Sequence, residues 1–352
     1  MVNWVEAQKP ILHWLVHRAG LRQQTIEIEP GTVMTMWVPQ EKATKKRAVV
    51  PEASKTTTEN NSDKRRRGEA AEKPVVVLVH GFAAEGIVTW QFQFGALASE
   101  YDVYVPDLFF FGGSTTDVAD RSPGFQAECL AAALDRLGVE RCTAVGFSYG
   151  GMVAFKMAEL RPDLVTSLVI SGSVYAMTDS ISKATLTELG FASSSELLLP
   201  ASIEGLKALL SVTMHKKLWF PEFLYRDFLE IMFSNRKERS ELLEGLVISN
   251  KDAKVPSLNQ VRQNEQEIWW SSLDLFNTVV LNYLQRILLL WGENDNIFNL
   301  ELAKNMKEQL GEKAALESIS NAGHLLHIER PCIYNCHLKN FLALVNSENT
   351  KN

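Results

Sequence analysis

The residues with the clearest chemical potential surround Ser148, which Gly146 and Gly150 flank in the pattern G-x-S-x-G. The apolar residues 142–145 predict a buried strand before the serine, and residues 152–160 have the apolar spacing of a helix after it. A serine in a sharp turn between a strand and a helix is typical of a nucleophile elbow. The two glycines carry no Cβ atoms that would collide across the strained turn. The pattern therefore predicts that the Ser148 hydroxyl attacks a carbonyl carbon.

A serine hydroxyl is a poor nucleophile at neutral pH and needs a base. His324 lies in a turn after the last predicted strand, and Asp295 follows the strand predicted at residues 287–291. Both turns can reach the same rim of a sheet, where the carboxylate would orient the imidazole and stabilise the imidazolium. Glu293 is the alternative acid, and His327 is expected to pack at the start of the closing helix. The chain order serine, acid, histidine is the order that an elbow of this kind uses.

Two backbone N–H groups are expected to stabilise the charge that develops on the attacked carbonyl oxygen. Tyr149 opens the helix that follows the nucleophile, and Phe82 follows the strand predicted at residues 74–79. We expect these two N–H groups to form an oxyanion hole. His80 and Asp107 are expected to stabilise turns by hydrogen bonding, Gly81 to have a structural role near the site, and Glu329 to be a helix-start residue.

Strands and helices alternate along most of the chain. Apolar runs predict buried strands at residues 74–79, 101–107, 142–145, 165–172, 287–291 and 316–319. Helices between them, such as residues 125–137, indicate an α/β fold with a mostly parallel, doubly wound sheet. Residues 24–29 and 32–38 alternate in polarity around Pro30-Gly31 and predict a β-hairpin ahead of this sheet. Residues 331–345 predict a closing helix.

The alternation stops between residues 174 and 260, where helical segments occur instead, among them residues 221–233 and 236–248. Because this excursion lies between two strands of the sheet, after the sixth strand, we expect a helical cap over the active site. The chain is therefore divided into four parts. Residues 1–22 form an amphipathic N-terminal helix, and residues 23–173 with 286–346 form the α/β core. Residues 174–260 form the cap, and residues 261–285 are an insertion.

Residues 40–73 differ in composition from the rest of the core. Lys, Glu, Thr, Ser and Asn dominate them, and a basic run occupies residues 64–67. A basic run can be a nuclear import signal or contact an anionic surface. Acidic residues surround this one, so we expect a solvated, disordered loop between two strands.

Four motifs, in their order along the chain, resemble those of the α/β-hydrolase superfamily: His80-Gly81, Gly146-x-Ser148-x-Gly150, Gly292-Glu293-Asn294-Asp295 and Asn321-Ala322-Gly323-His324. Residues 1–3 and 26–33 are similar to those of a plant subgroup of small serine hydrolases. That subgroup is similar to bacterial meta-cleavage product hydrolases and to monoacylglycerol lipases. The resemblance implies an α/β-hydrolase fold and places the acid at Asp295.

The resemblance implies a serine hydrolase that cleaves a small, apolar carboxylic ester through an acyl-enzyme. A hydrolase of C–C bonds in vinylogous diketones is the alternative enzyme, and a ligand receptor on the same fold is the alternative outside enzymes. Epoxide hydrolases and haloalkane dehalogenases of this fold have Asp at the elbow, so Ser148 argues against their chemistry. No metal site or nucleotide signature is present in the sequence, and no cofactor is expected.

Residues 261–285 carry a separate prediction. In the plant subgroup, a cap that ends like residues 255–260 continues directly into a strand like residues 286–292. The 25 intervening residues correspond to 75 nucleotides, begin with Val, whose codons start GT, and end with Gln, one of whose codons ends AG. A retained intron is one interpretation. The other is a genuine extra cap helix, because Ile268, Trp269 and Leu273 could bury one face.

The bulk composition limits the kinds of partner that the chain is expected to bind. The chain of 352 residues has 46% hydrophobic residues and a net charge of −6, which argue for a globular protein and against nucleic acid as a main partner. No His or Cys cluster completes a zinc site around Cys332 and Cys336, and reduced thiols are expected. No prediction is made for the oligomeric state.

The N-terminus predicts neither a signal peptide nor a membrane span, so a cytoplasmic protein is expected. Apolar residues near one face of residues 4–18 predict an amphipathic helix, begun or broken at Pro10. Such a helix can lie on a membrane surface. Docking on its own domain is the more common use of such a face, and we favour it, with peripheral membrane contact as the alternative.

Overall fold

The computed structural model describes residues 3–43, 72–82, 84–256 and 285–349. The loop predicted to be disordered lies outside the described residues except at its two ends. At the first end, helix α2 (Gln40–Ala43) continues from the hairpin instead. The predicted insertion also lies outside the described residues, apart from Gln285. The side-chain amide of Gln285 is buried and donates to the backbone oxygen atoms of Ala158, at 3.3 Å, and Val165, at 2.7 Å.

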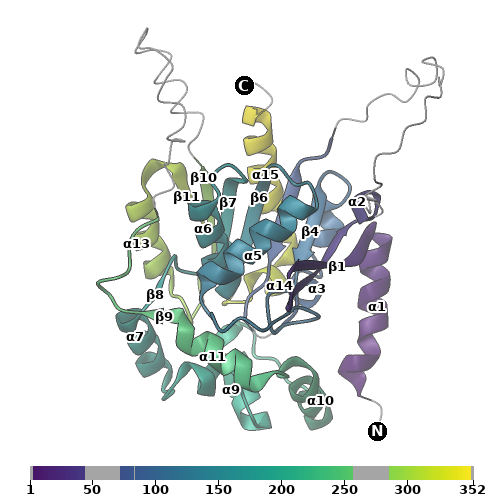
Figure 1. Ribbon diagram of the computed structural model, residues 1–352. Helices are drawn as coiled ribbons and strands as arrows, with labels where there is room; N and C mark the ends of the chain where they lie inside the picture. Colours follow the sequence, from purple (N-terminus) through teal and green to yellow (C-terminus); the bar gives the residue numbers. More distant parts are fainter. Residues whose placement is uncertain (1–2, 44–71, 83, 257–284, 350–352) are drawn as a thin grey trace, which may run out of the picture.

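A twisted sheet forms the centre of the molecule (Figure 1). Its strands follow the order β1-β2-β4-β3-β6-β7-β10-β11, parallel from β4 to β11, with β1 and β2 antiparallel at one edge and the short β5 paired to β2. The strands are β1 (Leu21–Glu29), β2 (Thr32–Pro39), β3 (Val75–Val79), β4 (Asp102–Pro106), β5 (Thr115–Thr116), β6 (Cys142–Phe147), β7 (Val165–Ser171), β10 (Arg286–Gly292) and β11 (Ala314–Ile319).

Successive residues of the central strands point to opposite faces of the sheet, and each face has its own hydrophobic core. In β3, Val77 and Val79 belong to one core and Val76 and Leu78 to the other. This two-sided burial is why the parallel strands read as continuous apolar runs. The first face is covered by α5 (Pro123–Arg136), α6 (Tyr149–Leu160) and α13 (Leu300–Leu310). The second is covered by α1 (Trp4–Arg18), α3 (Gly86–Thr89), α4 (Phe94–Leu97) and α15 (Pro331–Asn349), which α14 (Leu326–Glu329) precedes.

A helical layer lies beyond one end of the sheet, at the bottom of Figure 1. It follows β7, the sixth strand of the continuous sheet once the side-paired β5 is set aside. We use the name helical layer for β8 (Met177–Thr178), α7 (Asp179–Leu189), α8 (Ser194–Leu198), α9 (Ile203–Thr213), α10 (Glu222–Met232), α11 (Arg236–Leu246) and β9 (Val247–Ile248). Strands β8 and β9 pair with each other and close the layer.

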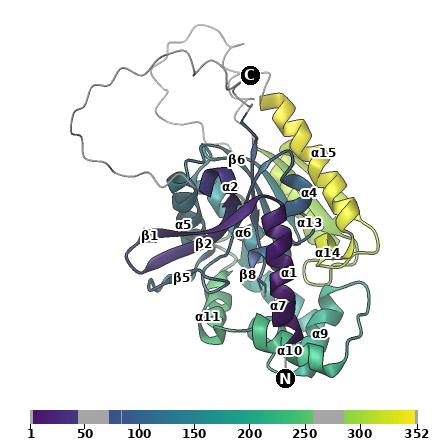
Figure 2. The ribbon, with the colours of Figure 1, turned by 90° about the vertical axis from the view of Figure 1, so that its right-hand side faces the viewer.

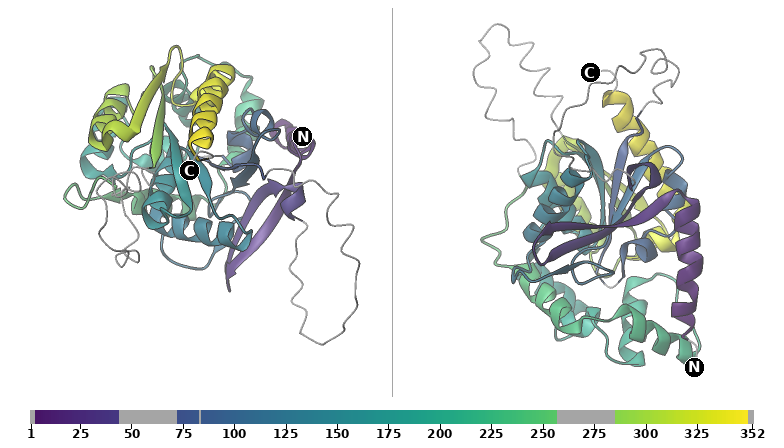
Figure 3. Two further views of the ribbon diagram at one scale, coloured as in Figure 1. Left: turned by 90° about the horizontal axis from the view of Figure 1, so that it is seen from above. Right: turned by 45° about the vertical axis from the view of Figure 1, so that its right-hand side comes forward.

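The hairpin of β1 and β2 and the N-terminal helix α1 complete the fold. The hairpin of β1 and β2 projects past the edge of the parallel strands, and α1 runs beside it with its first residues next to α10 (Figures 2 and 3). Helix α1 continues through Pro10, which the sequence predicted to begin or break it. A proline costs an internal helix one backbone hydrogen bond, and here the packing of Leu12 and Val16 into the second core stabilises the helix against that loss.

Candidate active site

The strand β6 ends at Phe147 and the helix α6 begins at Tyr149, so Ser148 alone forms the turn between them. Its backbone has φ 52° and ψ −122°, a conformation that L-residues rarely adopt. Three hydrogen bonds hold it: the Ser148 N–H donates to the Ser171 oxygen at 2.9 Å, and the Ser148 oxygen accepts from Ser173 Oγ at 2.6 Å and from the Gly151 N–H at 2.9 Å. Surrounding structure thus fixes a strained residue, as is common where a side chain must be presented for chemistry.

The glycines of the elbow permit close backbone approach on two sides. A Cβ atom on Gly146 would lie 2.6 Å from the Gly150 oxygen, and one on Gly150 would lie 2.3 Å from the His80 oxygen. The first contact is the collision across the turn expected from the sequence. The second is with the residue after β3, so Gly150 also brings the predicted oxyanion turn close to the nucleophile.

Three side chains that are far apart in the sequence meet at this elbow. His324 Nε2 lies 3.1 Å from Ser148 Oγ, and His324 Nδ1 lies 2.8 Å from Asp295 Oδ2. Because a carboxylate only accepts, the Nδ1–H donates to Asp295, which leaves Nε2 to accept the serine proton. Asp295 and His324 are 3% and 5% exposed, so little water competes for these hydrogen bonds.

The Asp295 carboxylate is held in place by backbone N–H groups that follow it in the chain. Asp295 Oδ1 accepts the N–H groups of Ile297, at 2.8 Å, and Phe298, at 2.9 Å, which leaves Oδ2 for the imidazole. The alternative acid, Glu293, is exposed and accepts a hydrogen bond from Ser318 Oγ at 3.0 Å. The structure therefore brings Asp295, not Glu293, to the histidine.

Gly172 is part of this arrangement, although sequence reasoning placed it only at the end of a strand. Its φ is +50°, and a Cβ atom there would lie 2.9 Å from His324 Nδ1 and 3.1 Å from Asp295 Oδ2. Any side chain at this position would press into the hydrogen bond between acid and base. The only sequence signal was a glycine directly after β7, at the sheet rim that carries the serine.

The two residues predicted for the oxyanion hole both border Ser148. Phe82 and Tyr149 line the same pocket as Ser148, and their rings meet edge to face with centroids 6.3 Å apart. Tyr149 is the first residue of α6, so its N–H has no acceptor within the helix and lies at the positive end of the helix dipole.

The turn behind Phe82 is organised by two buried polar groups with the hydrogen-bonding roles expected of them. His80 Nδ1 donates to the Gly81 oxygen at 2.7 Å, and Nε2 accepts the Leu108 N–H at 2.9 Å. Burial lowers the pKa of His80 to about 4, so its ring is neutral. Asp107 Oδ1 accepts the Gly86 N–H at 2.8 Å, and burial raises the pKa of Asp107 to about 7.

His327 packs as expected, inside an aromatic cluster at the start of the closing helices. Its ring lies 4.4 Å from that of Phe147 and 5.1 Å from that of Trp90, between centroids. Neither ring nitrogen has a hydrogen-bond partner among the described residues. Burial lowers the pKa of His327 to about 3.

Glu329 differs from the expectation of a helix-start residue. It ends α14, and its carboxylate accepts backbone N–H groups from Gly323 at 2.7 Å, Lys216 at 2.9 Å and His215 at 3.2 Å. It therefore ties the turn before His324 to the segment between α9 and α10. No sequence signal could have shown this, because the contact spans more than one hundred residues.

A cavity of about 50 Å³ opens in front of the serine, between the core and the helical layer. A single water molecule needs roughly 10–15 Å³ on such a measure, so there is space for a small group only. The core contributes Phe82, Ser148, Tyr149, Met152, Ile297, Phe298 and His324. The helical layer contributes Met177, Ser182, Thr185, Leu186, Ser194, Leu197, Leu198, Leu243 and Leu246. The wall facing the catalytic side chains is mostly apolar.

One buried arginine fastens the helical layer to the core. Arg239 of α11 is 4% exposed, and its Nε donates to the Phe110 oxygen at 3.0 Å. Its guanidinium lies over the Phe111 ring, 4.2 Å from the centroid, and burial lowers the pKa of Arg239 to about 10. The same turn of the core therefore supports both Phe82, whose ring contacts Phe111, and the helical layer.

Two absences concern the described residues alone. Within 3–43, 72–82, 84–256 and 285–349, no group of His, Cys, Asp and Glu side chains is arranged to hold a metal ion. None of the helices in these ranges is both long enough and apolar enough to cross a bilayer.

Comparisons with known proteins give a consistent family and varied activities. The sequence profile of the family described as alpha/beta hydrolase fold matches residues 74–331. Human epoxide hydrolase 4 is 28% identical over 289 residues, which cover 77% of this chain and 72% of that protein. An uncharacterized hydrolase of Bacillus subtilis, YugF, is 23% identical over 278 residues, which cover 77% of this chain and 90% of that protein.

Solved structures share the fold at lower identity. A bacterial membrane phospholipase A superposes with a TM-score of 0.67 at 21% identity, covering 97% of this chain and 92% of that one. The 2-hydroxy-6-oxo-6-phenylhexa-2,4-dienoate hydrolase of Rhodococcus superposes with a TM-score of 0.61 at 18% identity, covering 92% and 99%. The profile match spans most of the chain and includes the serine, the acid and the histidine. The chain therefore belongs to the α/β-hydrolase family.

Proposed function

We propose that this protein is a serine hydrolase that cleaves a small, apolar carboxylic ester through an acyl-enzyme. The observation that carries the proposal is the continuous hydrogen-bonded chain from Ser148 Oγ through His324 to Asp295. In acyl transfer, His324 Nε2 takes the serine proton as Oγ attacks the ester carbonyl, and then gives it to the departing alcohol. Asp295 stabilises the imidazolium in between, and water repeats the sequence to release the acid.

The oxyanion of each tetrahedral intermediate is assigned to the backbone N–H groups of Phe82 and Tyr149. Fixed donors stabilise developing charge without reorganising, and removing one such donor typically costs about 10²–10³-fold in kcat. The support here is the position of both residues on the wall of the cavity into which Ser148 opens.

The substrate class follows from the cavity. Its apolar lining favours an uncharged ester, and its volume of about 50 Å³ favours a short acyl chain. Epoxide opening, the activity named for human epoxide hydrolase 4, is not the proposed reaction. Serine at the elbow would form an ether with an epoxide carbon, and water cannot release the product from an ether as it can from an ester.

A fluorophosphonate probe together with a panel of p-nitrophenyl esters of increasing acyl length tests the proposal. We expect rapid labelling of the wild-type protein, none of Ser148→Ala, and the fastest turnover with the shortest esters. Labelling without turnover of any ester would favour the ligand-receptor alternative. Faster cleavage of a vinylogous diketone than of any ester would favour the C–C hydrolase. Either result would overturn the proposal.

A further inference from the structure

The segment between α9 and α10 exposes an unusual run of side chains. Residues 215–220 are all exposed and form neither helix nor strand. Leu218, Trp219 and Phe220, which we call the apolar tip, are 41%, 82% and 38% exposed, and Phe223 in the first turn of α10 is 41% exposed. Single exposed apolar residues are ordinary, but a cluster that includes an almost fully exposed tryptophan marks an interaction surface.

The apolar tip is held in place from beneath. Tyr225 is 4% exposed, and its hydroxyl accepts the Phe220 N–H at 3.2 Å and donates to the Leu218 oxygen at 3.5 Å. The rings of Tyr225 and Phe220 meet edge to face, with centroids 5.7 Å apart. One buried side chain therefore fixes the backbone on both sides of Trp219 and directs the indole outward. Such a shape is preorganised for an external partner.

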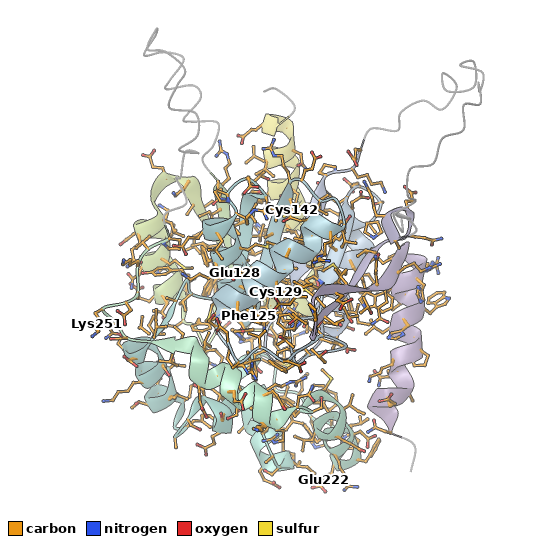
Figure 4. All side chains as sticks on the ribbon, in the orientation of Figure 1. Phe125, Glu128, Cys129, Cys142, Glu222 and Lys251 are labelled. Atoms are coloured by element: carbon orange, nitrogen blue, oxygen red, sulfur yellow. The ribbon has the colours of Figure 1, made fainter. Side chains whose placement is uncertain are left out.

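Two adjacent lysines directly precede the apolar tip, in a chain whose net charge is −6. Lys216 and Lys217 are exposed directly before it, and Arg226 is exposed on α10. Of the acidic residues on α10, Asp227 and Glu230 follow Arg226, and Glu222 is the one closest in sequence to the tip. It lies at the extremity of the helical layer (Figure 4). Aromatic side chains that project outward beside lysines suit the interface of a bilayer, where the rings enter the headgroup region and the ammonium groups meet anionic lipids.

We propose that the apolar tip, with Lys216 and Lys217, docks the protein on a membrane surface that contains anionic lipids. The binding is peripheral: a few apolar side chains enter the headgroup boundary and the cations supply electrostatic attraction. This site differs from the contact that the sequence suggested for the N-terminal helix. Its elements belong to the helical layer, which forms one wall of the active-site cavity.

The base of the tip lies next to the catalytic turn. The Glu329 carboxylate joins the N–H groups of His215 and Lys216 to that of Gly323, the residue before His324. The Leu325 N–H also donates to the Thr213 oxygen at 3.2 Å. A bilayer at the tip would therefore sit beside the active-site rim, and an apolar ester dissolved in it would have a short path to Ser148. This last step rests on the proposed function; the docking itself does not.

Co-sedimentation with vesicles tests the docking. The Ser148→Ala protein is mixed with vesicles of phosphatidylcholine alone or with added phosphatidylglycerol, so that binding is measured without hydrolysis. We expect binding to the mixed vesicles, and at least about a 10-fold loss when Leu218, Trp219 and Phe220 are all replaced by Ser. Leu344→Ser is the matched control, because Leu344 is 48% exposed near the end of α15, opposite the helical layer (Figure 1).

The contribution of the two lysines to vesicle binding can be measured separately from that of the apolar tip. Replacing Lys216 and Lys217 by Gln should weaken binding to the mixed vesicles about 10-fold or more, at roughly 1 kcal/mol for each lysine near the surface, and added salt should have a similar effect. Lys304→Gln, on α13, is the matched control and should bind normally, since its side chain is 56% exposed in an ion pair with Glu301.

Three results would overturn the proposal: wild-type binding by the triple Ser variant, equal binding to both kinds of vesicle, or no vesicle binding with a dimer that the triple variant converts to a monomer. The last would assign the tip to a second copy of the chain. If docking holds, the triple variant should also lose hydrolysis of an ester carried in vesicles while keeping that of a soluble short ester. If neither ester is cleaved by the wild-type protein but vesicles still bind, the proposed function fails and the docking stands.

Discussion

The rim of the sheet and the helical layer face each other across one cavity, yet they contribute different things to it. The rim provides Ser148 and His324 to the cavity wall, with Asp295 behind the histidine, and all three lie in turns that follow strands of the parallel sheet. The helical layer provides mostly Leu and Met side chains, on helices of five to eleven residues. Strand ends that are hydrogen-bonded on both sides hold atoms to the tolerance that proton transfer requires. Short amphipathic helices can change their side chains without disturbing those atoms.

The largest predicted effect on turnover comes from replacing a rim serine rather than a serine of the helical layer. Ser148→Ala should reduce ester turnover by about 10⁴-fold or more, because it removes the nucleophile, while thermal stability stays nearly unchanged. Ser194→Ala, at a serine of the same cavity but on the helical layer, should change turnover only a few-fold. Steady-state kinetics and a thermal melt measure both. A Ser148→Ala protein with a tenth of wild-type activity would remove the rim from the mechanism.

A comparison of Asp295 with its neighbour Glu293 tests the role of the rim residue by residue. Asp295→Asn should lower kcat about 10⁴-fold, because an amide in place of the carboxylate favours the wrong imidazole tautomer. Glu293→Gln, two residues away and exposed, should leave kcat within a few-fold of wild type. Comparison of the two kcat values decides the assignment. Equal losses in both variants would mean that the turn as a whole matters rather than the hydrogen bond at 2.8 Å.

Low pH should destabilise the core. His80 and His327 are held neutral with pKa values of about 4 and about 3, below the unfolded value of 6.5, so their stabilisation is full above pH 6.5 and is lost as the pH falls toward those values. Each contributes a slope of up to about 1.4 kcal/mol per pH unit. Asp107, with a pKa of about 7, acts in the opposite direction and cancels about one of them.

We therefore expect the free energy of unfolding to fall by about 1.4 kcal/mol for each pH unit between 6.5 and 4, as measured by urea titration. His327→Phe should remove most of this dependence, and the exposed His215→Gln should retain it. A His327→Phe protein with the wild-type slope would show that His327 does not carry the linkage.

The smallest effect concerns selectivity and comes from the helical layer. Leu243→Ala enlarges the cavity and should shift the preference toward longer acyl chains about 10-fold in kcat/KM, since one or two methylenes are worth that much in an apolar pocket. Leu242→Ala is the matched control. It is equally buried on α11 but does not line the cavity, so it should cost stability without changing the preference. The same shift in both variants would mean that loosening α11, rather than pocket shape, sets selectivity.

Much of the site could be predicted because its signals are local. The elbow needs small residues around a strained serine, which can be read from five consecutive positions, and the buried strands show as apolar runs. Where the neighbours in the sequence do not decide the outcome, prediction was weaker. Helix α1 passes through Pro10 because the second core holds it, and α2 occupies residues assigned to a disordered loop.

The sequence by itself determined the fold class and the strand-turn-helix setting of Ser148, because strand periodicity and turn sterics act between neighbours in the chain. The family resemblance favoured Asp295 over Glu293, but only the tertiary structure set the Asp295 carboxylate against the imidazole, gave Gly172 its place beside that ring, and joined Glu329 to the base of the apolar tip. Those contacts include ones between residues more than one hundred positions apart, and His324 and Ser148, whose side chains also meet, are 176 residues apart. Their geometry exists only once the sheet has brought its strand ends to one rim, so no local pattern can encode it.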